Sequence, residues 1–132
     1  MEIHYTPFIR VVYSTGNFND FNLNIGVTNI GRGNSNDIAL DDPIISSINS
    51  SLYFDGYTFS FFDLSESNKT YIKYQESENS ILLEPNTPYQ IINGTRIQLS
   101  NETQLILLFC EDCENNHQNS LNQTTPRTTT IF

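Results

Sequence analysis

A small set of polar residues in the first half of the chain has the types needed to hold a phosphate group without a metal. Arg32 stands in a Gly-Arg-Gly turn, and the hydroxyl residues Ser46 and Ser47 follow fourteen and fifteen residues later. An arginine guanidinium is always charged and forks toward phosphate oxygens, while serine hydroxyls donate further hydrogen bonds. Arg32 has a second candidate role that is purely structural, which is to tie two loops together through backbone carbonyls or Asp37.

The overall negative charge of the chain disfavours the binding of an anion. The 132 residues include 15 acids and 6 bases, which gives a formal net charge of -9. Because the chain lacks the basic stripe that duplex binding requires, we expect no direct nucleic-acid binding by this domain. A phosphate site would depend on local positive charge around Arg32 and Lys69.

Metal, redox and catalytic chemistry have little support. Cys110, Cys113 and His117 would need His4 to complete a four-ligand zinc site, so we expect two reduced thiols, no metal and no cofactor. Neither histidine lies near a nucleophile in a recognisable arrangement, so we expect no catalytic residue and no enzyme.

The first ten residues contain an acid at position 2 and no apolar core, which argues against a signal peptide. No apolar run approaches the length of a membrane span, so we expect no membrane association. These features favour a cytosolic or nuclear protein.

Short strands must position the polar residues. Nine Phe, seven Tyr and a single Met favour pleated, half-buried surfaces over helices. Besides the runs that flank two turns, strands are expected at Phe8–Tyr13, Phe21–Val27, Asn29–Gly31, Ile38–Leu40, Thr70–Lys73, Ile81–Leu83 and Thr103–Cys110. Asp55-Gly56 and Asn93-Gly94 each predict a hairpin in which both turn residues have positive φ. The sequence therefore predicts an all-β, antiparallel β-sandwich of about eleven short strands.

The sandwich is expected over residues 1–113. Residues 114–132 are rich in Asn and Thr and poor in apolar side chains, so they are expected to form a flexible tail or the start of a linker. The chain would then be the N-terminal piece of a longer protein.

The order of these signals resembles the forkhead-associated (FHA) domain, a phosphothreonine-binding β-sandwich of about eleven strands. The segments that carry the resemblance are Gly31-Arg32, Asn36-Asp37-Ile38-Ala39-Leu40, Ser46-Ser47-Ile48-Asn49, Ser67-Asn68-Lys69-Thr70 and Asn93-Gly94-Thr95-Arg96-Ile97. The resemblance implies that Arg32, Ser46 and Ser67 contact a phosphate and that Asn68 holds the peptide backbone.

Three positions depart from the FHA pattern. Ser47 stands where many members place Arg or Lys, Asn49 replaces a histidine that braces the loop, and Lys69 replaces a glycine. A Cβ at residue 69 is unfavourable if φ is positive there. One missing cation weakens phosphate binding by roughly ten- to a hundredfold. The candidate phosphopeptide pocket, Arg32, Ser46, Ser47, Ser67, Asn68 and Lys69, is therefore expected to be weakened or lost.

A small FHA subgroup, in mediator proteins of DNA-damage checkpoint signalling, carries the domain at the N-terminus and uses it to homodimerise. The resemblance thus implies a homodimerising module of a nuclear DNA-damage adaptor, whose partner is a second copy of itself. The alternative is a working reader that recruits phosphothreonine-containing proteins.

Overall fold

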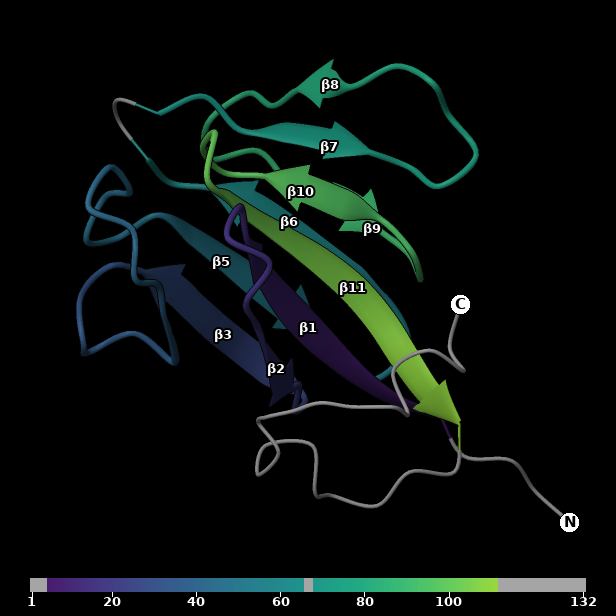
Figure 1. The fold of residues 1–132 in the computed structure, drawn as a ribbon. Coiled ribbons are helices and arrows are strands. Elements are labelled where there is room, and N and C mark those ends of the chain that lie inside the picture. Colours follow the sequence, from purple (N-terminus) through teal and green to yellow (C-terminus); the bar gives the residue numbers. More distant parts are fainter. Residues whose placement is uncertain (1–4, 66–67, 112–132) are drawn as a thin grey trace, which may run out of the picture.

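The computed structural model describes residues 5–65 and 68–111. Its eleven strands are β1 (Tyr5–Tyr13), β2 (Phe18–Asn22), β3 (Gly26–Gly31), β4 (Ile38–Ala39), β5 (Ser50–Phe54), β6 (Phe59–Asp63), β7 (Tyr71–Lys73), β8 (Ile81–Leu82), β9 (Tyr89–Ile91), β10 (Arg96–Gln98) and β11 (Thr103–Glu111). They form one sheet in the order β2-β1-β11-β10-β7-β8 and a second in the order β4-β3-β5-β6-β9 (Figure 1). All strand pairs are antiparallel except β3 and β4. The prediction of an all-β sandwich of about eleven strands is confirmed.

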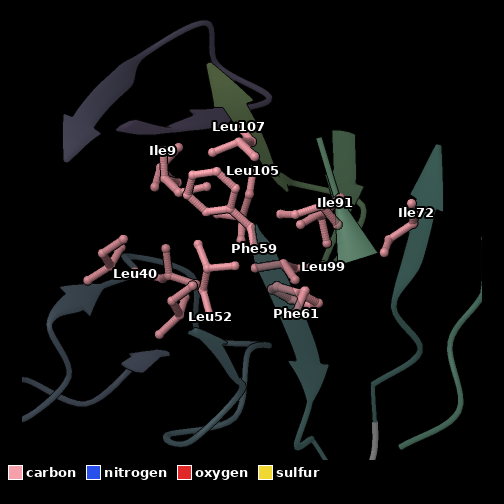
Figure 2. Packing of buried hydrophobic residues seen from close by; sticks show 14 of the residues in the cluster. Ile9, Leu40, Leu52, Phe59, Phe61, Ile72, Ile91, Leu99, Leu105 and Leu107 are labelled. Carbon is pink, nitrogen blue, oxygen red and sulfur yellow. The ribbon is translucent and has the colours of Figure 1, made fainter. Parts of the chain in front are cut away.

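The core lies between the inner faces of the two sheets. Along β6 the burial alternates, so that Phe59 and Phe61 point inward while Ser60 and Phe62 are partly exposed. Phe61 on one sheet and Leu105 on the other are both fully buried (Figure 2). Burial of a side chain of this size stabilises the fold by about 1.5–3 kcal/mol. The packed core therefore holds the two sheets together, and with them the loops at the ends of their strands.

The predicted strand Phe21–Val27 is wrong, because the chain changes sheets within it. β2 ends at Asn22 in the first sheet, and β3 begins at Gly26 in the second. Gly26 has a φ of 121°, which residues with a side chain rarely adopt. After this change Val27 points to the outside of the second sheet.

The hairpin predicted at Asp55-Gly56 is confirmed, since β5 pairs with β6. Its turn is longer than predicted and runs over residues 55–58, with positive φ at Gly56 but not at Asp55. The Asp55 carboxylate instead accepts hydrogen bonds from the backbone N–H groups of Tyr57 and Thr58, at 2.7 Å each. The aspartate shapes this turn through its side chain.

The hairpin predicted at Asn93-Gly94 is wrong. β9 pairs with β6 in the second sheet, whereas β10 pairs with β7 and β11 in the first. Gly94 does have a positive φ of 90°. The turn is therefore present, but it carries the chain from one sheet to the other.

The expected tail, residues 114–132, lies outside the described residues, so the boundary at residue 113 stays a prediction. Cys110, at the end of β11, is disulfide-bonded, so the expectation of reduced thiols is wrong for this residue. Within residues 5–65 and 68–111 no helix is long and apolar enough to cross a membrane.

Candidate functional site

Three loops meet at one end of the sandwich. β3 ends at Gly31 beside the start of β5, and β6 ends at Asp63 beside the same end of β5. We call the segments 32–37 and 40–49, together with residues 64–65 and 68–70, the apical loops. They lie at the left of Figure 1, and they carry the described residues of the candidate pocket.

The first two apical loops are joined by backbone contacts. The N–H of Arg32 donates to the Ser46 carbonyl at 3.0 Å, and the N–H of Gly33 donates to the Ser47 carbonyl at 3.4 Å. Asn36 Nδ2 also donates to the Ser47 carbonyl at 2.8 Å. A Cβ on Gly31 would lie 2.3 Å from the Ser47 carbonyl oxygen, so glycine is required where the two loops cross.

Arg32 holds the second loop with its side chain as well. Its Nε donates to the carbonyl of Ile45 at 2.8 Å, which confirms the structural role considered from the sequence. Asp37, the other partner considered for Arg32, accepts a hydrogen bond from the N–H of Asn29. A guanidinium has five N–H donors, so the exposed Arg32 keeps donors for a ligand. Among the described residues no ion pair is formed by Arg32.

Asn68 lies in the third apical loop, between β6 and β7, and contacts the second apical loop. Its Oδ1 lies 3.5 Å from the hydroxyl oxygen of the half-buried Ser46, the outer limit of a hydrogen bond. The Ser65 hydroxyl oxygen lies 2.8 Å from both the Asn68 carbonyl and the buried Asp63 carboxylate, which positions Asn68. Ser67, the remaining predicted donor, lies outside the described residues.

Lys69 fits its position without strain. Its φ is not positive, since Asn86 is the one non-glycine residue with positive φ in the described part of the chain. The objection to a Cβ at residue 69 therefore does not apply. Lys69 is exposed, and Ser47 is exposed on the neighbouring loop. The structure thus brings Arg32, Ser46, Ser47 and Asn68 together, with Lys69 next to Asn68 in the chain.

Beneath the apical loops lie buried polar side chains whose lack of hydrogen-bond partners the sequence does not predict. Asn49, Ser50 and Thr70 are 0%, 1% and 0% exposed. Both polar atoms of the Asn49 side chain, and the hydroxyls of Ser50 and Thr70, lack a hydrogen-bond partner among the described residues. Asn49 braces its loop through the backbone instead, donating to Ile30 and accepting from Leu64. A sequence pattern cannot predict such unpaired atoms, because they depend on tertiary packing.

An open groove of about 830 Å³ lies beside this site but differs from it in charge. It is formed by the β1–β2 turn, the segment 39–43 and Glu102, and its acids include Asp41 and Asp42. Burial raises the pKa of Asp42, but hydrogen bonds from Thr103, Ser100 and the N–H of Ile44 together bring this pKa below its ordinary value. Asp42 is therefore ionised at neutral pH, and the groove repels a phosphate.

The described residues contain no cluster of three or more His, Cys, Asp or Glu side chains that could hold a metal ion. The candidate zinc ligands other than Cys110 lie outside the described residues. At the apical loops the side chains of Arg32, Ser46 and Asn68 can donate hydrogen bonds to an anion.

The FHA domain family model matches residues 28–100, which contain the described pocket residues, nearly all of the β4-β3-β5-β6-β9 sheet and strands β7, β8 and β10 of the other sheet. The chain belongs to the FHA domain family. A search of curated proteins found no match for this FHA domain.

Solved FHA domains share its fold at low sequence identity. The N-terminal FHA domain of Rad53p from S. cerevisiae, in complex with a phosphothreonine peptide, is 17% identical with a TM-score of 0.63, and the match covers 78% of this chain and 94% of that one. The FHA domain of CT664 from Chlamydia trachomatis is 17% identical with a TM-score of 0.61, over 78% and 96% of the two chains. An FHA domain studied for phosphothreonine-dependent interactions is 23% identical with a TM-score of 0.60, over 76% and 95%.

Proposed function

We propose that this FHA domain is a non-catalytic protein-protein interaction module that binds a phosphothreonine-containing segment at its apical loops. The observation that carries the proposal is the convergence of Arg32, Ser46 and Asn68, with the Arg32 charge unpaired among the described residues. The phosphothreonine peptide in the Rad53p complex supports the same class of ligand for this chain. Ser67 is the further donor that the FHA resemblance implies.

The pocket is proposed to be weak. Arg32 commits its Nε to Ile45, and Ser47 provides no charge in a chain of net charge -9. A hydrogen bond to a charged group contributes about 1.5–3 kcal/mol, so one missing cation costs roughly ten- to a hundredfold in affinity.

The test compares phosphorylated and unphosphorylated threonine peptides from a library, using fluorescence anisotropy at low and high salt. Arg32→Ala should abolish phospho-dependent binding. Arg96→Ala is the matched control, because Arg96 is exposed on β10 and donates to Gln104 away from the apical loops. A library without any phospho-dependent hit, or equal binding by both variants, contradicts the proposal.

Lys69 is proposed to restore part of the missing positive charge. Lys69→Gln should weaken phosphopeptide binding by roughly tenfold. Lys73→Gln removes the same charge from an exposed residue of β7 and should leave the affinity unchanged. If the two variants bind equally, the Lys69 side chain does not contact the phosphate.

Homodimerisation within a nuclear DNA-damage adaptor is the second candidate function. The observation that favours self-association is the set of exposed apolar residues on the second sheet, which includes Val27 and Tyr53 at 59% and 44% exposure. The checkpoint role and the nuclear location rest on the sequence resemblance. Sedimentation equilibrium of unphosphorylated residues 1–132 tests this candidate, and a monomer at every concentration contradicts it.

A further inference from the structure

The outer face of the β4-β3-β5-β6-β9 sheet carries an exposed apolar patch. Val27 on β3 lies opposite Tyr53 on β5. Ile25 and Tyr57 extend this pair and are 71% and 91% exposed. Ile25 Cδ1 lies 3.4 Å from the place of a Cβ on Gly56, so Ile25 lies beside the turn that contains Tyr57. We call Ile25, Val27, Tyr53 and Tyr57 the β3–β5 patch.

The β3–β5 patch lies within an uncharged face. The outward residues of β3, β5 and β6 are Val27, Asn29, Ser51, Tyr53, Ser60 and Phe62, and none of these six is charged. Asp55 lies at the rim, where its carboxylate accepts the backbone N–H groups of its own turn. Two copies can therefore bring these six positions together without placing one acid opposite another.

We propose that a second copy of this chain binds at the β3–β5 patch, with the two patches facing each other across a two-fold axis. The proposal rests on the second candidate function, homodimerisation. A two-fold interface uses the same surface on both copies, and an uncharged apolar surface is complementary to itself.

The size of the patch fits the centre of such an interface. An aromatic side chain buries about 150–250 Å², so Tyr53 and Tyr57 at their measured exposures offer roughly 200–350 Å² between them. With Ile25 and Val27 the patch is about the size of the largest apolar patch on a typical monomer, which often has a function. A standard interface buries about 800 Å² per partner, so the polar neighbours on β3, β5 and β6 would form the rim.

The experiment measures dimerisation of residues 1–132 by sedimentation equilibrium over a wide concentration range. Tyr53→Glu places an uncompensated charge in the proposed interface and should weaken dimerisation by at least about a hundredfold. Tyr71→Glu is the matched control, because Tyr71 is 37% exposed on β7 in the other sheet. This variant should dimerise like the wild type.

A second variant guards against misfolding of Tyr53→Glu. Ile25→Ser combined with Tyr57→Ser removes apolar area from two highly exposed side chains, and it should also weaken dimerisation. A wild-type monomer at all concentrations overturns both the patch and homodimerisation, and it leaves phosphopeptide binding untouched. A wild-type dimer that persists in the Tyr53→Glu and double variants overturns the patch alone.

Discussion

Replacing Thr70 by valine is expected to stabilise the domain. Thr70 lies at the end of the third apical loop, is 0% exposed, and has no hydrogen-bond partner for its hydroxyl among the described residues. Valine keeps the branched shape of threonine and puts a methyl group in place of the hydroxyl. The change therefore removes a buried polar group without opening a cavity.

The expected gain follows from the cost of the unpaired hydroxyl. Leaving a buried donor or acceptor unsatisfied costs about 1–3 kcal/mol, so Thr70→Val should raise the free energy of unfolding by this amount. For a domain of this size, the melting temperature should rise by roughly 4–12 °C. Urea unfolding followed by far-UV circular dichroism and tyrosine fluorescence measures the change, since the chain has seven Tyr and no Trp.

Thr95→Val is the matched control with the opposite expected sign. Thr95 is also 0% exposed, but its hydroxyl oxygen accepts the N–H of Ile92 at 3.0 Å. Valine at residue 95 leaves this N–H unpaired and should cost about 1–3 kcal/mol. If both variants lose stability, Thr70 has a hydrogen-bond partner and the reasoning is refuted.

Three further substitutions test other contacts. Gly31→Ala should destabilise the domain by about 1–3 kcal/mol in urea unfolding, whereas Gly33→Ala should be nearly neutral, because the nearest atom to its new Cβ would be Asn36 Nδ2 at 3.6 Å. Asp42→Asn should lower the free energy of unfolding at neutral pH. This loss should disappear as the pH falls below 3.8, the ordinary pKa of an aspartate, because the pKa of Asp42 in the folded protein is lower still. Asp20→Asn breaks the bidentate pair with the buried Arg10 and should cost roughly 3 kcal/mol even in high salt; an exposed, screened pair would instead show almost no loss in thermal melts.

The fold could be predicted from the sequence where local features decide it, namely the alternation of apolar and polar residues along a strand and the residue types in a turn. The β5–β6 hairpin follows from alternating aromatic residues around Asp55-Gly56, and β11 follows from the apolar run after Thr103. Sheet membership could not be predicted, because a period of two residues does not say which sheet a strand joins. For this reason the alternation in Phe21–Val27 predicts one strand and Asn93-Gly94 predicts a hairpin, although in both segments the chain passes from one sheet to the other.

The order of the sequence motifs indicates which residues belong to the candidate site. It does not indicate which contacts these residues make or how much those contacts stabilise the site. Arg32, Ser46 and Asn68 lie on neighbouring apical loops, and their contact with a phosphopeptide stays a prediction. The bond from Arg32 to Ile45, the unstrained backbone of Lys69 and the unpaired amide of Asn49 depend on contacts between loops distant in sequence. Short motifs contain no information about such contacts.

The two bonds of Arg32 to the second apical loop bear on how FHA sequences change over evolutionary time. Its backbone N–H and its Nε hold Ser46 and Ile45 whether or not a ligand is bound. A descendant that had lost all phosphate binding would still gain stability from the bond between the Arg32 side chain and Ile45, and it would still need Gly31 for the close approach to Ser47. The side chains of Ser46 and Asn68, which share one contact at 3.5 Å, would be free to drift first. A Gly-Arg pair in a newly sequenced relative is therefore a marker of ancestry, and the identities of residues 46 and 68 are the better record of whether recognition has survived.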